Sequence, residues 1–153
     1  MNQNHSPLEL ERFLPYRLSI LSNQVSQAIA DEYQDQFSLA MTEWRVMAVL
    51  ARFEPLSARE VAEHTAMDKV AVSRAVAGLI ELGYLERKAA EEDGRRSKLY
   101  LTRTGQSVYD EIVPMAMAEE QALEGVLTPE ERLELTRLME KLAGSASPGR
   151  PLW

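Results

Sequence analysis

The sequence predicts a mainly α-helical protein that carries one small β-hairpin. Three observations lead to this fold class. Several segments repeat apolar residues every three or four positions, which is the spacing of an amphipathic helix. Ser57 and Thr128 are each followed three residues later by Glu, a pattern typical of a helix start. Short alternating runs typical of strands occur at 84–88 and 97–101.

The first helix is expected to begin at Ser6-Pro7, as a capped start with proline in the first turn. Pro15 should break or kink it, because proline lacks an N–H and clashes with the preceding turn. The helix should then continue to about Tyr33 along one apolar stripe. That stripe consists of Leu14, Leu18, Leu21, Val25, Ala28 and Ile29.

A second helix is expected over 43–52, with Thr42 as its cap. Ser57 should open a short third helix, and the break at 65–67 separates it from a fourth. Asp68 should cap that fourth helix, which runs from Lys69 to Leu82 and ends at Gly83. Two helices joined by so short a turn have the outline of a helix-turn-helix.

The two strand-like runs follow directly and should form a hairpin with a charged loop at 89–96, which makes the unit a winged helix-turn-helix. Thr102 should cap a long helix to about Leu123, and Thr128 should start the last one. The chain end is rich in Ser, Gly and Pro and is expected to be disordered.

Composition excludes several classes. The chain has no cysteine, which removes disulfides, thiol redox sensing and thiolate metal sites. No apolar run is long enough to cross a bilayer and the first residues are polar, so a cytoplasmic location is expected. Gly-x-Ser-x-Gly, phosphate-loop and His-Glu-x-x-His patterns are absent. We therefore expect no enzyme, no cofactor and no metal site.

Charge is distributed unevenly along the chain, whose net charge is −7. Residues 1–68 hold five basic and ten acidic side chains, and residues 104–153 hold four and nine. Residues 69–103 hold eight basic and five acidic ones, a net of +3. A basic middle between acidic flanks favours a polyanionic partner for the middle, although clustering by chance is the alternative.

The helix that begins at Lys69 is amphipathic. Its expected inner face is Val72, Val76, Leu79 and Ile80, and its outer face begins with Lys69, Val70, Ser73 and Arg74. Such a helix after a tight turn suits the major groove of DNA. Small Ser73 permits close approach, Arg74 can reach a guanine edge or a phosphate, and Lys69 suits phosphate. The alternative is an ordinary surface helix.

The hairpin loop contains Asp93-Gly94-Arg95-Arg96. An arginine at a hairpin tip can enter the electronegative minor groove, and a nearby carboxylate can orient its guanidinium. The alternative is a solvated charged turn. The candidate DNA-binding residues are Ser57, Lys69, Val70, Ser73, Arg74, Asp93, Arg95, Arg96 and Lys98.

In order, the segments Ser-Ala-Arg-Glu-Val-Ala, Asp-Lys-Val-Ala-Val-Ser-Arg, Leu-Gly-Tyr-Leu-Glu-Arg, Asp-Gly-Arg-Arg-Ser and Leu-Tyr-Leu-Thr-x-x-Gly resemble the MarR family of regulators. The resemblance implies a homodimer on near-palindromic double-stranded DNA. It implies that the helix from Lys69 is the recognition helix and that Asp93 positions Arg95 in the minor groove. Members mostly repress transcription, and many release DNA when a small molecule binds between the dimer helices and the DNA lobe.

The resemblance also divides the chain. Residues 1–34 are the expected N-terminal dimerisation helix, 35–103 the DNA-binding lobe, 104–144 the C-terminal dimerisation helices and 145–153 a disordered tail. A compact lobe alone cannot bury the apolar stripes at 14–29 and 133–142, so two chains should pack them together. Packing within one chain is the alternative.

The effector is expected to be a small organic molecule, if one exists. The lack of cysteine argues against peroxide sensing, and the presence of only two histidines argues against metal sensing. The segment around Arg17 resembles that of family members that regulate aromatic-acid breakdown, where a first-helix arginine meets the ligand carboxylate. A salt bridge of Arg17 across the dimer is the alternative, as are a core role for Trp44 and a surface role for His64. The candidate ligand-binding residues are Arg17, Ser22, Trp44, Met47 and His64, for a phenolic or other aromatic acid.

These features favour a repressor released by an aromatic carboxylate. The alternatives are a ligand-independent regulator or a protein-interaction module of the same fold.

Overall fold

A computed structural model describes residues 7–89 and 97–153. Its regular elements are six α-helices, one 3-10 turn and one two-stranded antiparallel sheet. In order along the described chain they are η1 (Leu10–Arg12), α1 (Leu14–Phe37), α2 (Met41–Phe53), α3 (Ala58–Thr65), α4 (Lys69–Glu81), β1 (Leu85–Ala89), β2 (Ser97–Leu101), α5 (Arg103–Glu124) and α6 (Pro129–Ala146). The predicted class, mainly helical with a small hairpin, is confirmed.

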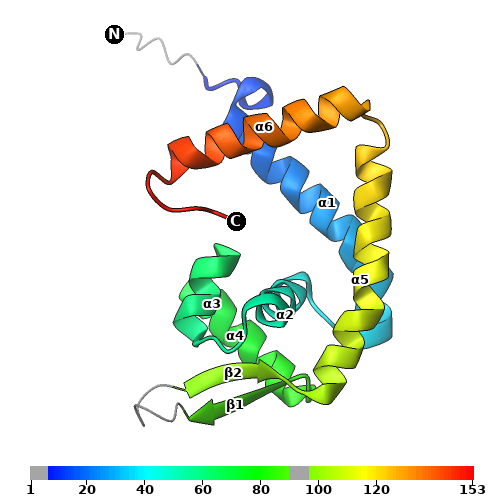
Figure 1. The fold of residues 1–153 in the computed structure, drawn as a ribbon, viewed down its shortest axis with the longest axis vertical. Helices are drawn as coiled ribbons and strands as arrows, with labels where there is room; N and C mark the ends of the chain where they lie inside the picture. The colour runs from blue at the N-terminus through cyan, green and yellow to red at the C-terminus, as the bar shows by residue number, and fades with distance from the viewer. Residues whose placement is uncertain (1–6, 90–96) are drawn as a thin grey trace.

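The molecule consists of a lobe and a set of long helices (Figure 1). Helices α2, α3 and α4 and the hairpin form the lobe, while α5 leads away from it to α6, which crosses near the start of α1. α1 packs along α5. The apolar core lies mainly in the lobe and includes Leu50, Val61, Leu79, Leu99 and Ile112.

Local capping explains the helix-turn-helix. The Ser57 hydroxyl accepts a hydrogen bond from the Glu60 N–H (3.2 Å), and the Glu60 carboxylate accepts one from the Ser57 N–H (2.7 Å). α3 ends at Ala66, which has a left-handed conformation (φ 54°). The Asp68 carboxylate then accepts the Ala71 N–H (2.8 Å) at the start of α4. The predicted caps at Ser57 and Asp68 are confirmed.

The hairpin is tied to the lobe along β2. Its register pairs Leu85 with Leu101 and Ala89 with Ser97. The Leu99 N–H donates to the Leu56 carbonyl (2.7 Å), and the Leu101 N–H donates to a Glu54 carboxylate oxygen (2.8 Å). β2 is therefore held between β1 and the segment that leads into α3. The predicted second strand is confirmed, and the first begins one residue later than expected, at Leu85.

A close backbone approach fixes the start of α5 against the lobe. The Thr102 hydroxyl donates to the Gly83 carbonyl (2.6 Å) and accepts the Gly105 N–H (3.0 Å). A methyl group at Gly105 would collide with the carbonyl oxygen of Tyr84. The Leu-Thr-x-x-Gly pattern thus combines a helix cap with the one side chain small enough for this contact.

Two expectations about helix starts are wrong. Residues 7–9 are not helical, and Pro15 lies in the first turn of α1 instead of breaking the helix. Proline is tolerated there because first-turn N–H groups have no partner within the helix. α2 begins at Met41 with Ala40 as its cap residue, not Thr42. The Glu43 carboxylate accepts the Ala40 N–H (2.8 Å) and so replaces the expected hydroxyl cap.

α6 differs from the other helices because none of its residues is buried. Thr128 caps it as predicted, and it extends to Ala146, two residues into the segment expected to be disordered. Ser147–Trp153 follow without helix or strand, and the Arg150 guanidinium lies 3.5 Å from the Glu63 carboxylate. Among the described residues, no helix has the length and apolarity needed to cross a bilayer.

Candidate nucleic-acid interface

The four residues expected to form a recognition surface on α4 lie on one exposed face. Lys69, Val70, Ser73 and Arg74 are all exposed, and Val70 keeps 61% of its surface. The opposite face packs against α2 and α3. Its buried residues are Val72, Ala75, Val76 and Leu79. Ile80 was expected on this inner face and is instead 39% exposed, whereas Ala75 is buried.

The start of α4 is favourable for an anion. Free N–H groups and the helix dipole give a helix N-terminus partial positive charge, and Lys69 and Arg74 add two cations, while the Asp68 carboxylate already accepts the Ala71 N–H. Arg59 and Lys69 line the same surface hollow at the turn between α3 and α4, together with Glu63 and Asp68, and Arg59 lies 3.4 Å from the Glu63 carboxylate. Arg59 was not among the predicted DNA contacts. Its place in the first turn of the helix opened by Ser57 was the available signal.

Two predicted DNA contacts have partners within the protein. Ser57 is half-buried and its hydroxyl caps α3. The Lys98 ammonium donates to a Glu60 carboxylate oxygen at 2.8 Å. This hydrogen bond, with those from the backbone and hydroxyl of Ser57, lowers the pKa of Glu60 to about 2. The capping role of Ser57 was predicted from the sequence spacing, whereas the bond between Lys98 and Glu60 was not.

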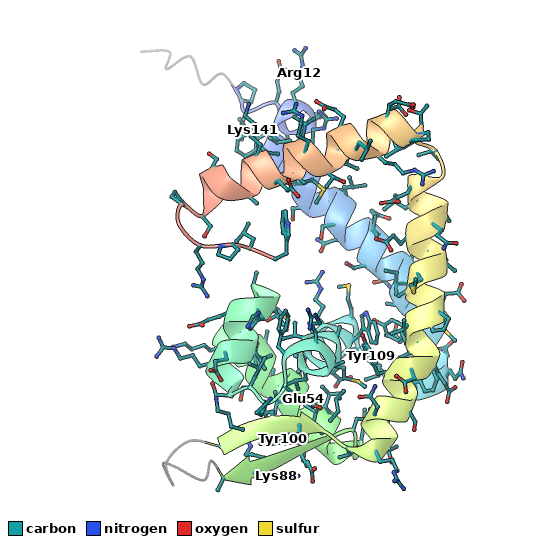
Figure 2. The ribbon with its side chains drawn as sticks, viewed as in Figure 1. Arg12, Glu54, Lys88, Tyr100, Tyr109 and Lys141 are labelled. Carbon is teal, nitrogen blue, oxygen red and sulfur yellow. The ribbon has the colours of Figure 1, made fainter. Side chains whose placement is uncertain are left out.

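The strands of the hairpin carry further cations toward their loop end (Figure 2). The Lys88 ammonium lies over the Tyr100 ring, 4.8 Å from its centroid, and 3.1 Å from the Glu86 carboxylate. Arg87 donates to the Ser97 hydroxyl (3.1 Å). The predicted tip contacts Asp93, Arg95 and Arg96 lie outside the described residues, so their roles stay predictions.

The five candidate ligand-binding residues lie in three different places. Arg17 and Ser22 are exposed on α1, where Arg17 lines a surface groove with Leu14 and Leu21. Trp44 and Met47 belong to α2, and Met47 is fully buried. His64 stacks on Phe53 at the end of α3, with ring centroids 4.5 Å apart. Within a single chain these residues do not converge on one described site.

An aromatic cluster marks the junction of the lobe with the long helices. Trp44 contacts Tyr33 at 5.7 Å and stacks on Tyr109 at 5.5 Å between ring centroids. Tyr33 is fully buried, and burial is the main cause that raises its pKa to about 12. Its hydroxyl has no hydrogen-bond partner among the described residues. Tyr109 (Figure 2) comes from α5, Tyr33 from α1 and Trp44 from α2, so the cluster joins these three helices.

A capped helix-turn-helix, a following hairpin and a cationic outer face on the second helix define a winged-helix DNA-binding protein. A family model described as the MarR family matches residues 37–96. The chain is 30% identical over 105 residues to YwoH of Bacillus subtilis, an uncharacterised HTH-type transcriptional regulator, covering 66% of this chain and 76% of that protein.

Solved structures agree with this match. A MarR/EmrR family regulator from Acinetobacter sp. ADP1 is 29% identical, with a TM-score of 0.82, over 91% of this chain and 98% of that one. The chain therefore belongs to the MarR family of transcriptional regulators, which are DNA-binding proteins and not enzymes.

A more distant structure shows the same fold. BpsR of Bordetella bronchiseptica, whose DNA binding is regulated by 6-hydroxynicotinic acid, is 23% identical, with a TM-score of 0.77, over 89% of this chain and 96% of that one. At this identity the likeness concerns the fold alone.

Proposed function

We propose that the protein is a homodimeric repressor that binds a near-palindromic operator and releases it when an aromatic carboxylate binds. The observation that carries the DNA part is the exposed start of α4, where two cations and two small or apolar side chains face outward. This surface lies in the only one of the three charge segments with a net positive charge.

Each residue on this surface has a chemical role in the proposal. Arg74 donates to a guanine edge or a phosphate, and Lys69 pairs with phosphate. Ser73 leaves room for the groove wall. Val70 is an exposed aliphatic side chain on an otherwise polar surface, which suits contact with the methyl group of a thymine.

The flanking contacts come from the hairpin and from α3. Arg95, held by Asp93, enters the minor groove, and Arg96 pairs with phosphate. Arg59 joins Lys69 in contacting the backbone beside the major groove, which is supported by the hollow that they share.

The dimer is supported by apolar surface that one chain leaves uncovered. Leu14, Leu18 and Leu21 on α1 are exposed, as are the apolar side chains of α6. Those of α6 are Leu133, Leu135, Leu138, Met139 and Leu142. Burying one such side chain contributes about 1.5–3 kcal/mol, so a second copy of this chain is the proposed cover. Residues 1–34 and 104–144 would then form the interface, and each dimer presents two lobes.

The effector is proposed to act at the junction of the lobe and the dimer helices. The aromatic cluster supports an aromatic ligand, and Arg17 supplies a cation for its carboxylate. Ser22, Trp44, Met47 and His64 remain proposed contacts, although one chain does not bring them together. Regulation of BpsR by 6-hydroxynicotinic acid is consistent with this ligand class.

The test begins with selection of bound fragments from genomic DNA, followed by fluorescence anisotropy on the selected duplex. We expect tight binding by the wild type and at least about tenfold weaker binding by Arg74→Ala, which removes one specific contact. Titration with benzoate, hydroxybenzoate and cinnamate-type acids should release the duplex. If none of these acids acts, the protein is a ligand-independent regulator, and if no duplex is selected the DNA-binding proposal is wrong.

A further inference from the structure

One ion pair links β2 with α3, two elements that are far apart in sequence. The Lys98 ammonium on β2 and the Glu60 carboxylate in the first turn of α3 lie 2.8 Å apart, although 38 positions separate them in sequence. Lys98 keeps 28% of its side-chain surface, the lowest value for a cation among the ion pairs of the described residues. Such a side chain is turned toward the protein instead of extending into solvent.

The carboxylate that receives Lys98 is fixed in place. The same Glu60 oxygen accepts the Ser57 N–H at 2.7 Å, and the Ser57 hydroxyl accepts the Glu60 N–H. Glu60 cannot follow a moving lysine without losing these helix-start hydrogen bonds. Its pKa of about 2 keeps it ionised at any pH near neutrality.

The position of Lys98 along β2 lets this contact hold the outer part of the strand. Backbone hydrogen bonds at Leu99 and Leu101 hold the inner part of the strand to the lobe. Beyond Leu99, the described contacts of Ser97 are with Ala89 and Arg87, which belong to the hairpin itself. In the described part of the wing, Lys98 is therefore the outermost residue of β2 that is tied to the helix-turn-helix.

We propose that Glu60 and Lys98 form a clamp that sets the position of the wing relative to α3, and that Lys98 supports DNA binding through this clamp instead of by touching a phosphate. The inference rests on the proposed function, in which wing and α4 contact the operator together. Glu60 and Lys98 are thus positioning residues.

The clamp predicts that removal of the Glu60 carboxylate lowers operator affinity. Removing an acidic side chain from a DNA-binding lobe ordinarily strengthens binding, because the carboxylate repels phosphate. Glu60→Gln keeps a side-chain oxygen for the Ser57 N–H but weakens the pair with Lys98. The clamp therefore predicts that Glu60→Gln binds the selected operator about three- to tenfold more weakly than the wild type, in the range of coupling typical for paired residues.

The experiment measures operator affinity by anisotropy for Glu60→Gln, Lys98→Met and the double variant. The matched control is Glu81→Gln, an exposed carboxylate at the end of α4. We expect both single variants to weaken binding, the double variant to be no weaker than either, and the control to bind equally or more tightly. Lys98→Arg, which keeps the ion pair, should retain wild-type affinity.

Salt dependence separates the clamp from a phosphate contact and from a general loss of stability. Loss of one phosphate contact makes the slope of log K against log salt less negative by about 0.9. With the clamp, Lys98→Met keeps the wild-type slope. Thermal unfolding and mass measurement on each variant establish that the folded dimer is the species compared.

The inference is wrong if Glu60→Gln binds as tightly as the wild type or more tightly, or if Lys98→Met makes the salt slope less negative. Arg74→Ala in the same series distinguishes this failure from failure of the proposed function. A weakened Arg74→Ala with a tighter Glu60→Gln overturns the clamp alone, whereas wild-type binding by Arg74→Ala overturns the proposed recognition surface.

Discussion

Three single residues have structural roles that differ from what their residue type suggests. Lys98 is a cation on a DNA-binding lobe, yet it is bonded to Glu60. Tyr33 is a buried phenol without a partner among the described residues. Gly105 is required because of a neighbouring backbone carbonyl and not because of a positive φ. Each of these assignments predicts how a substitution behaves.

Tyr33→Phe tests the buried hydroxyl. The pKa of Tyr33 is raised from 10.0 to about 12 in the folded protein, so the unfolded chain loses its proton first as the pH rises. The free energy of unfolding should therefore fall between pH 10 and about pH 12, and part of this fall should vanish in Tyr33→Phe. Urea unfolding of both proteins at about pH 9 and about pH 11 measures the difference. An equal fall in both would contradict the assignment.

At neutral pH the same variant should be no less stable than the wild type, because an unpaired buried hydroxyl contributes no hydrogen bond and costs desolvation. A fall in the free energy of unfolding larger than about 1 kcal/mol would indicate that the Tyr33 hydroxyl has a hydrogen-bond partner.

Gly105→Ala tests the contact between α5 and the turn after α4. The new methyl group would meet the Tyr84 carbonyl, so the helix start must shift, at a cost of about 1–3 kcal/mol in unfolding free energy. Gly144→Ala is the matched control, since it lies in α6 with no atom near the added carbon. It should stabilise the protein slightly, because alanine favours helix over glycine. Equal stability of the two variants would show that Gly105 is not constrained.

At the scale of elements, local sequence patterns predicted those features that depend on local hydrogen bonds. The caps at Ser57, Asp68, Thr102 and Thr128 lie where the sequence indicated, because a capping side chain acts within one helical turn. The second strand was also predicted correctly, since its alternation reflects burial of Leu99 and Leu101 on one face.

Most of the wrong or missed predictions concern contacts between residues that are distant in sequence. Pro15 was expected to interrupt a helix because sequence alone does not say which residue begins it. The Glu60–Lys98 contact was missed because no local period connects residues so far apart in sequence. The five ligand candidates were grouped by chemistry, and a single chain separates them. For Glu60, Lys98 and the ligand candidates the missing information is tertiary packing, whereas Pro15 was misinterpreted because the start of the helix was assigned too early.

The exposed Val70 on the outer face of α4 predicts a contact with a thymine methyl group in the operator. If Val70 contacts a thymine methyl, replacing that thymine by deoxyuridine should weaken wild-type binding by about three- to tenfold at one position in each half-site. Val70→Ala should bind more weakly to the thymine operator and lose this discrimination. A position-by-position deoxyuridine series in the selected operator measures it. Sensitivity at the same position in both proteins would assign the methyl contact to another residue.

In the whole molecule, most of the exposed large apolar side chains of the described residues belong to α1, α5 and α6, although the lobe also exposes Phe53, Val70, Ile80 and Leu82. The long helices lie to one side of the lobe (Figure 1). α6 has no buried residue of its own, so its place in the fold makes physical sense when a second chain covers it. Dimerisation then also spaces two copies of α4, which links assembly with operator binding.

Leu138→Asp tests this link. A carboxylate in the proposed interface would be desolvated without a partner, so the dimer should dissociate and operator affinity should fall sharply. Arg52→Asp, an exposed position near the end of α2 and outside the proposed interface, is the control and should remain dimeric. Light scattering after gel filtration gives both masses. A dimeric Leu138→Asp protein with normal affinity would move the interface away from α6.

The central claim is that two copies of the α4 surface bind adjacent major grooves of one duplex. The most direct measurement is the mass and footprint of the protein bound to its selected operator. We expect two chains for each operator, with protected half-sites centred about one helical turn, roughly 10–10.5 base pairs, apart. A single chain on the duplex, or one continuous footprint without two-fold repetition, would contradict it.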